Sequence, residues 1–217
     1  MKRLLTLLAI AAIGLVPGAL RGADSVIGVV VRDDAGRPVA DAVVYAATSG
    51  TAARGGRATM DQENQEFVPH VLPVEVGTAV TFPNRDGIRH HVYSFSPAKR
   101  FELPLYTGTP AAPVVFDQAG AVVLGCNIHD WMVAYVYVAP SPHFAKTGSD
   151  GRAALRGLPP GPQELRVWHP RLRTPGEAPA QRVTLGADAL TVDFKVSLRP
   201  ERKRPRTTPR YENQQGG

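Results

Sequence analysis

Short apolar runs separated by turn residues fill most of the chain. The first two runs are VIGVVV at 26–31 and VADAVVYAA at 39–47, and the turn DDAGRP joins them. This pattern predicts a β-hairpin. Further strand-like segments follow between about residue 60 and residue 139, at 68–76, 78–82, 91–95, 114–116, 121–126 and 133–138. Short strands with Gly, Pro and Asn turns between them predict an all-β chain containing a Greek-key sandwich.

The pattern changes after residue 139. Residues 147–170 predict two strands around the turn LPPGP, and residues 181–198 predict two more. Residues 48–58 are small and Gly-rich without periodicity, which indicates a loop or a domain boundary. The stretch 199–217 is polar and interrupted by proline, and we expect a basic disordered tail there.

Composition agrees with this pattern. The 217 residues include 21 Gly and 20 Pro, which is high for a helical protein and usual for short strands joined by tight turns. The single Cys excludes a disulfide scaffold.

The net charge of +6 is concentrated at the two ends of the chain. Residues 1–22 carry three of these charges, and the tail carries four through six Arg and Lys against two Glu, so the body at 23–198 is left at −1. A nearly neutral body offers no broad basic face for a phosphate backbone. We therefore expect no nucleic-acid partner. The tail could dock an acidic partner or an anionic surface, or serve solubility alone.

Residues 1–22 have the pattern of an export signal. Lys2 and Arg3 precede an apolar run of about 13 residues, which Gly14 and Pro17 interrupt. A membrane-spanning helix needs about 20 apolar residues. We therefore predict a cleaved signal peptide, a periplasmic protein and no membrane span.

One short segment carries the candidate chemistry, CNIHDWM at 126–132. It places His129 three residues and Met132 six residues after Cys126. A soft thiolate, two imidazoles and a weak thioether suit copper in both of its oxidation states. Zinc could use the thiolate and the imidazoles but gains nothing from a thioether. No nucleophile elbow or positioned acid accompanies the Cys, so we do not expect an enzyme.

The second imidazole must come from elsewhere, and VTFPN at 80–84 followed by His90 offers it. Together with CNIHDWM, this pattern resembles the cupredoxins, the plastocyanin, amicyanin and halocyanin group of type 1 (blue) copper proteins, over about residues 60–139. The resemblance implies one type 1 copper and outer-sphere electron transfer between transient redox partners. The copper ligands that it implies are His90, Cys126, His129 and Met132.

Two details of this pattern stay open. The family usually has Asn after its first ligand His, whereas this chain has His91. Spacing from Asn84 favours His90, but strand alternation favours His91, because that choice turns Tyr93 and Phe95 inward. We take His90 as the ligand, with His91 as the alternative ligand and Asn84 as a residue that supports the site.

The resemblance also implies a surface for electron transfer. In the family the second ligand His reaches the surface through an apolar patch. Trp131 and Ile128 flank His129 and are the expected electron-transfer surface of this chain. Docking there would be weak and transient, as redox encounters usually are.

Two flanking segments resemble a different family. Residues 28–44 and 150–161 look like parts of transthyretin-like (carboxypeptidase-regulatory-like) β-sandwiches, which suggests that the copper domain is inserted into a split sandwich. The alternative is two independent hairpins beside one larger sandwich. The predicted scheme is a signal peptide at 1–22, a split transthyretin-like sandwich at 24–47 and 140–198, a cupredoxin-like domain at 59–139 and a tail at 199–217.

The complete chain looks like the periplasmic plastocyanin-like proteins labelled methylamine-utilisation proteins. Two other classes stay open beside electron transfer. A copper delivery or storage protein would have an exposed, flexible site and often a Met-rich run, whereas this chain has three Met in all. A structural β-protein with a vestigial site would bind no copper.

Overall fold

The computed structural model describes residues 26–47, 55–110, 112–174, 176, 178–186 and 188–201. The predicted signal peptide, residues 48–54 of the predicted boundary loop and residues 202–217 of the tail lie outside this range. The described residues form strands and turns without a helix, which confirms the prediction of an all-β chain. Within these ranges there is accordingly no helix with the length and apolarity that crossing a membrane requires.

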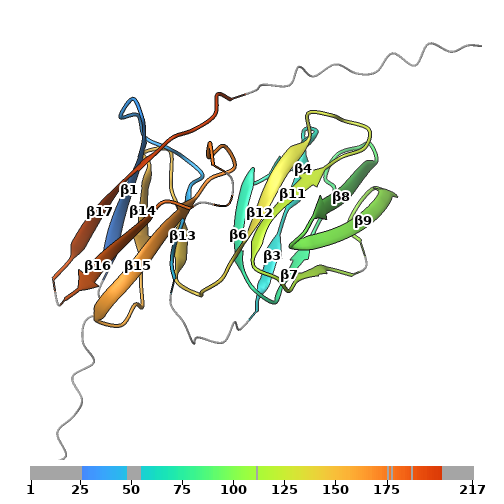
Figure 1. The fold of residues 1–217 in the computed structure, drawn as a ribbon. Helices are drawn as coiled ribbons and strands as arrows, with labels where there is room; N and C mark the ends of the chain where they lie inside the picture. Colours follow the sequence, from blue (N-terminus) through green and yellow to red (C-terminus); the bar gives the residue numbers. More distant parts are fainter. Residues whose placement is uncertain are drawn as a thin grey trace, which may run out of the picture.

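Strands from the two ends of the described chain form one sandwich, with blue and orange strands side by side (Figure 1). One sheet has the order β14–β1–β17 and the other the order β13–β2–β15–β16. The bounds of its strands are β1 Ile27–Asp33, β2 Val43–Ala46, β13 Phe144–Lys146, β14 Arg152–Leu155, β15 Gly161–Trp168, β16 Ala180–Leu185 and β17 Leu190–Val196. Alternate apolar residues of both sheets, such as Val29 and Phe194 facing Val44 and Leu165, fill a common core.

The predicted hairpin of the first two strands is wrong. The DDAGRP turn forms, with the Asp33 carboxylate accepting the backbone N–H of Ala35 and of Arg37, each at 2.9 Å. The chain then crosses to the opposite sheet, and only an isolated bridge from Arg32 to Pro38 joins the two segments. Burial explains the difference. All four residues of β2 are buried, so this strand is covered on both faces and sits inside a sheet.

The middle of the chain forms a second pair of sheets, with the orders β10–β7–β3 and β6–β12–β11–β8–β9. Their strands are β3 Arg57–Thr59, β6 Val71–Glu75, β7 Thr78–Thr81, β8 His90–Ser96, β9 Lys99–Tyr106, β10 Val114–Phe116, β11 Gly120–Gly125 and β12 Val133–Ala139. A small hairpin of β4 (Asp61–Glu63) and β5 (Glu66–Val68) closes one end. Phe82, Phe116, Leu124 and Val136 are among the buried residues between the two sheets.

Strand β9 was not predicted from the sequence. It has eight residues and contains Pro104, which cannot donate a backbone hydrogen bond to a neighbouring strand. The structure places β9 at the edge of the five-stranded sheet, where one side of the strand needs no partner. Phe101 and Leu103 of β9 pack on the core from this position.

Apolar and aromatic side chains join the two halves of the molecule. Val43 and Tyr45 from β2 are buried against Tyr137 and Ala139 of β12 and Val71 of β6. The Trp168 ring of β15 stacks on Tyr137 with a centroid distance of 4.6 Å. The Lys146 ammonium also donates to the Val71 carbonyl at 3.0 Å. The outer face of the five-stranded sheet is therefore partly covered by the other sandwich.

Candidate metal centre

Two neighbouring strands bring the predicted chemistry to one end of the middle sandwich. His90 is the first residue of β8, and Cys126 directly follows the last residue of β11. Strands β8 and β11 are antiparallel neighbours, so the beginning of one lies beside the end of the other. His129 lies in the loop that links β11 to β12. The backbone N–H of Met132 donates to the His129 carbonyl at 2.9 Å and closes this loop.

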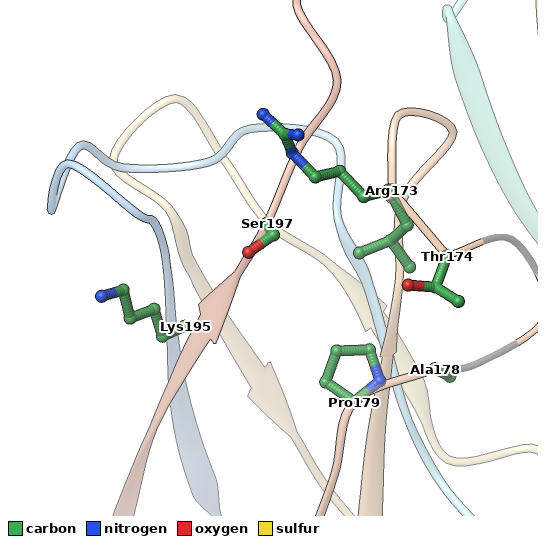
Figure 2. Close-up of a pocket in the computed structure, with 7 residues that line it drawn as sticks. Arg173, Thr174, Ala178, Pro179, Lys195 and Ser197 are labelled. Carbon is green, nitrogen blue, oxygen red and sulfur yellow. The ribbon is translucent and has the colours of Figure 1, made fainter.

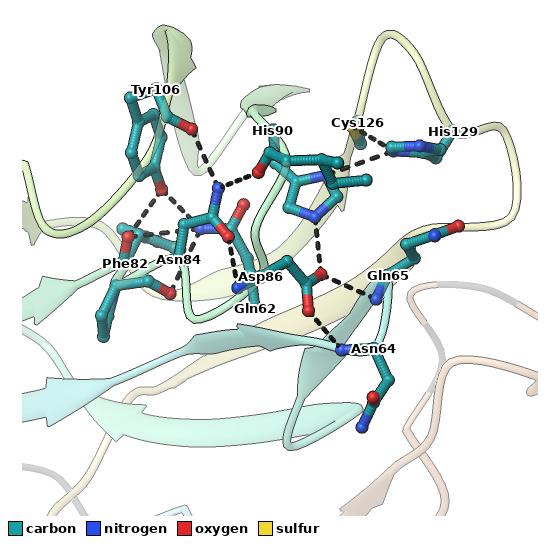
Figure 3. A network of polar contacts seen from close by, with 12 residues as sticks. Gln62, Asn64, Gln65, Phe82, Asn84, Asp86, His90, Tyr106, Cys126 and His129 are labelled. Atoms are coloured by element: carbon teal, nitrogen blue, oxygen red, sulfur yellow. Dashed lines mark hydrogen bonds and ion pairs between the residues drawn. The ribbon is translucent and has the colours of Figure 1, made fainter.

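Three potential ligand atoms converge there (Figure 3). Nδ1 of His90 lies 3.1 Å from Nδ1 of His129. Sγ of Cys126 lies 3.7 Å from the same His129 nitrogen. The nearest ligand atoms of His90, Cys126 and His129 all lie within 4.8 Å of one another. The resemblance implied four ligand residues. The structure brings three of them together, with their metal-binding atoms close to one another.

The group is shielded from solvent. His90 is 0% exposed, Cys126 4% and His129 8%. Burial lowers the pKa of His129, and the neighbouring His90 lowers it further. The imidazole of His129 therefore stays neutral at pH 7, the form in which a histidine binds a metal. Cys126 is a free thiol.

Met132 is buried in the same core cluster as Cys126. The neighbouring Trp131 ring packs on the His129 ring, with their centroids 5.0 Å apart. Ile128, in the same loop, is 36% exposed. The Trp131 Nε1–H is buried without a hydrogen-bond partner among the described residues. The thioether, the indole and the isoleucine thus all lie around the loop that carries His129.

The donor set fits a soft or borderline ion with few ligands. Nitrogen and sulfur ligands lie about 2.0–2.3 Å from such an ion, so neighbouring ligand atoms lie roughly 3.3–3.8 Å apart. The observed separations of 3.1 and 3.7 Å are close to this range. One thiolate and two imidazoles suit copper or zinc, whereas Mg²⁺ and Ca²⁺ need oxygen ligands. The buried Met132, three residues after His129, could add a thioether, which favours copper.

Asp86 is a part of the site that the sequence analysis missed. Its Oδ2 lies 2.7 Å from Nε2 of His90, on the side of the ring opposite to His129. Burial by itself raises the pKa of Asp86, but hydrogen bonds from Gln65, His90 and Asn64 outweigh this effect, and its pKa is lowered overall. Asp86 is therefore a carboxylate at neutral pH. In the sequence, its position four residues before His90 was the feature that could have indicated this contact.

Asn84 braces the loop rather than facing the ligand atoms. Its side-chain amide donates to the carbonyls of Ile88 and Tyr106, both at 2.9 Å, and its Oδ1 accepts the backbone N–H of Asp86. The Tyr106 hydroxyl donates to the Phe82 carbonyl at 2.6 Å, and burial raises its pKa to about 12. These bonds fix the segment that leads into His90.

His91 lies apart from the other predicted site residues. Its Nε2 contacts the Glu102 carboxylate of β9 at 2.9 Å, and its ring packs near Tyr93. Because successive residues of a strand point to opposite faces, His90 faces Cys126 and His91 faces the outer side of the sheet. The structure brings His90, not His91, into the His–Cys–His group.

A separate hollow of about 400 Å³ lies in the other sandwich (Figure 2). Arg173, Lys195 and Ser197 are among its lining residues, and all three are exposed. None of the predicted site residues lines it. The predicted ligands that the structure brings together lie elsewhere, at the start of β8 and in the loop after β11.

No protein-family model matches the chain, and a search of curated proteins finds no match either. Solved structures do match in part. A purple cupredoxin from Nitrosopumilus maritimus is 26% identical, with 38% of this chain and 99% of that chain covered and a TM-score of 0.34. A mutant of amicyanin in its reduced Cu(I) form is 22% identical, with 44% and 98% covered and a TM-score of 0.34. A copper-containing nitrite reductase from Thermus scotoductus is 22% identical with a TM-score of 0.37; the match covers 51% of this chain but only 28% of the reductase.

Proposed function

We propose that this chain is a type 1 copper protein that carries single electrons between redox partners. The observation that carries the proposal is the convergence of Nδ1 of His90, Sγ of Cys126 and Nδ1 of His129 in a buried site. The proposed ligands are these three atoms and, as a weak fourth, the thioether of Met132. Bound copper would supply a one-electron couple between Cu(I) and Cu(II).

The protein contributes a site that changes little between the two oxidation states. His90 and Cys126 are fixed at the ends of hydrogen-bonded strands, and the turn between His129 and Met132 fixes the remaining loop. Buried ligands keep water out of the site. A rigid, dry site lowers the reorganisation that each electron transfer needs, so this arrangement favours transfer over substrate chemistry.

His129 is the proposed route for electrons to the surface. His129 is 8% exposed, and its ring packs on the Trp131 ring. Ile128 and Ile88, which is 44% exposed, give this end of the sandwich an apolar character. A small apolar surface supports weak and short-lived docking, as an electron carrier requires.

The site is poorly suited to metal delivery. A delivery protein must hand its ion to a partner's ligands, which needs donor atoms that a partner can reach. Here all three donor residues are at most 8% exposed. Buried donors therefore favour electron transfer over delivery or storage.

We place this function in the periplasm, because residues 1–22 have the pattern of an export signal. We also propose the insertion of the copper domain into a split transthyretin-like sandwich. Its support is that β1 pairs with β14 and β17, and β2 with β13 and β15, across the middle of the chain. The second sandwich would then act as a scaffold or as a platform for partners.

Addition of Cu(II) to the metal-free full chain tests the proposal. We expect an intense absorption band at about 600 nm, because a thiolate bound to Cu(II) gives a strong charge-transfer transition. Cys126→Ser should abolish this band while the far-ultraviolet circular dichroism stays unchanged. His90→Ala should also abolish it, and His91→Ala, the matched control, should keep it.

Other spectra would favour other functions. Weak d–d absorption bands without the intense band would favour a copper delivery or storage protein, and no spectral change would favour a structural protein that binds no copper. Loss of the band in His91→Ala but not in His90→Ala would overturn the proposed ligand set.

A further inference from the structure

The second nitrogen of the His90 ring has a partner of its own. Nδ1 of this ring faces His129, and Nε2 lies 2.7 Å from Oδ2 of Asp86. A neutral imidazole that binds a metal through Nδ1 carries its proton on Nε2. That proton would therefore be donated to the Asp86 carboxylate.

Asp86 is itself held from several directions. Oδ1 accepts the backbone N–H of Asn64 at 2.7 Å, and Oδ2 accepts that of Gln65 at 2.8 Å. Both amides belong to the turn of the β4–β5 hairpin, where Asn64 and Gln65 have φ values of 56° and 58°. The backbone N–H of Asp86 donates to Asn84 at 3.0 Å (Figure 3). A carboxylate held in this way has little freedom to leave the imidazole.

We propose that Asp86 is a positioning residue that fixes the ring and the tautomer of His90 and makes Nδ1 a stronger donor to the oxidised metal. This inference rests on the proposed function, because it assigns a role within the same site. Carboxylate partners of metal-bound histidines orient the ring and raise its basicity. A more basic ligand stabilises Cu(II) more than Cu(I), so the Asp86 carboxylate lowers the reduction potential.

A merely structural role for Asp86 is the competing explanation, since the carboxylate also ties the β4–β5 turn to the loop before β8. Such a role would affect stability but would leave the potential of a correctly folded site unchanged. The reduction potential therefore separates the two roles.

The test is Asp86→Asn in the copper-loaded full chain, followed by a spectroelectrochemical titration. Asn keeps the size of the side chain and removes its charge. We expect the ratio of Cu(II) affinity to Cu(I) affinity to fall about tenfold. For a one-electron couple this fall corresponds to an upward shift of about 59 mV.

Asp117→Asn is the matched control. It makes the same change in net charge at an exposed pair with Lys99, with Nζ and Oδ1 3.0 Å apart. We expect no shift of the potential in this variant. If the wild type shows the intense band and Asp86→Asn shifts no further than Asp117→Asn, Asp86 has no such role, whereas the proposed function stands. A wild type that stays colourless with Cu(II) overturns both.

A second measurement needs no variant. In the Cu(I)-loaded wild type, which is diamagnetic, long-range ¹H–¹⁵N spectra report the tautomer of each histidine. We expect His90 to carry a proton on Nε2 that exchanges slowly with water. A His90 ring without this protected proton would overturn the inference even if Asp86→Asn failed to fold.

Discussion

His169 is a buried imidazole outside the candidate metal centre. It follows β15, is 6% exposed, and its Nδ1 accepts the backbone N–H of Arg171 at 3.1 Å. Its pKa is lowered to about 4, mainly by burial and also by the charges of Arg171 and His70, while Asp41 and a hydrogen bond to the Ala40 backbone act in the opposite direction. The folded protein therefore holds this ring neutral at a pH where the unfolded chain protonates it.

This difference predicts a pH-dependent stability. Because the folded pKa lies below the unfolded value of about 6.5, the stabilisation is complete above pH 6.5 and is lost as the pH falls toward about 4. The loss should reach about 3 kcal/mol, at about 1.4 kcal/mol for each pKa unit. His169→Asn keeps an acceptor for Arg171 but does not titrate. Urea denaturation at several pH values should show a shallower acid slope in this variant, and equal slopes would contradict the assignment.

The choice between His90 and His91 shows what sequence reasoning could and could not decide at this scale. Motif spacing grouped His90 with Cys126 and His129, and the structure brings these three together. Alternation pointed to His91 because Tyr93 and Phe95 were taken as inward-facing, yet Phe95 is 73% exposed. Aromatic residues also occupy the outer face of this sheet, so apolarity alone could not identify the core side.

At the scale of elements, the β4–β5 hairpin supports the site through its turn. Asn64 and Gln65 both have left-handed backbone conformations, which cost roughly 1–2 kcal/mol for a residue with a Cβ. Two-residue hairpin turns of this kind favour Asn followed by Gly. A glycine at position 65 would therefore make this turn more stable than the present Gln65 does.

Gln65→Gly should stabilise the protein by about 0.5–1 kcal/mol, because glycine adopts the left-handed conformation without steric cost. The backbone N–H that reaches Asp86 is kept, so the copper spectrum should not change. Denaturant unfolding measures the gain, and Glu63→Gly in the adjoining strand β4 is the control, which should destabilise. A loss of stability in Gln65→Gly would show that the Gln65 side chain contributes more than its backbone conformation costs.

Most strands could be located from apolar runs and turns, but their partners could not. The runs that became β1 and β2 read as a hairpin, although they lie in opposite sheets and pair with strands more than 95 residues away along the chain. Strand β9 was missed because Pro104 disfavours a strand unless the strand lies at a sheet edge. The first error arises because the pairing of β1 and β2 depends on contacts distant in sequence, which a local pattern does not contain. The second arises because the pattern does not show that β9, which pairs with the adjacent β8, lies at a sheet edge.

At the scale of the whole molecule, two cores meet along one aromatic interface. Each sandwich has its own buried apolar cluster, and a third cluster containing Tyr45, Tyr137 and Val71 lies between them. The interface covers β12 and β6 and leaves Phe95 of β8 exposed on the same sheet. The candidate copper site lies on strands that belong to the covered sheet, so we expect its stability to depend on the second sandwich.

Trp168→Ala tests this coupling. The variant loses the ring stacked on Tyr137 and should lose about 2–4 kcal/mol of stability, because a large half-buried side chain leaves a gap at the interface. The chain has two Trp, so Trp131 becomes its only tryptophan and its fluorescence reports the middle sandwich alone. Far-ultraviolet circular dichroism reports both sandwiches.

In the wild type we expect the two signals to change together during denaturation, because the intact interface couples the two cores. In Trp168→Ala they should separate into two transitions. Phe95→Ala, which removes an aromatic ring from the uncovered part of the same sheet, should change stability by less than about 0.5 kcal/mol and keep the signals together. If Trp168→Ala behaves like Phe95→Ala, the aromatic contact does not couple the sandwiches, and the candidate copper site is stabilised by the middle sandwich alone.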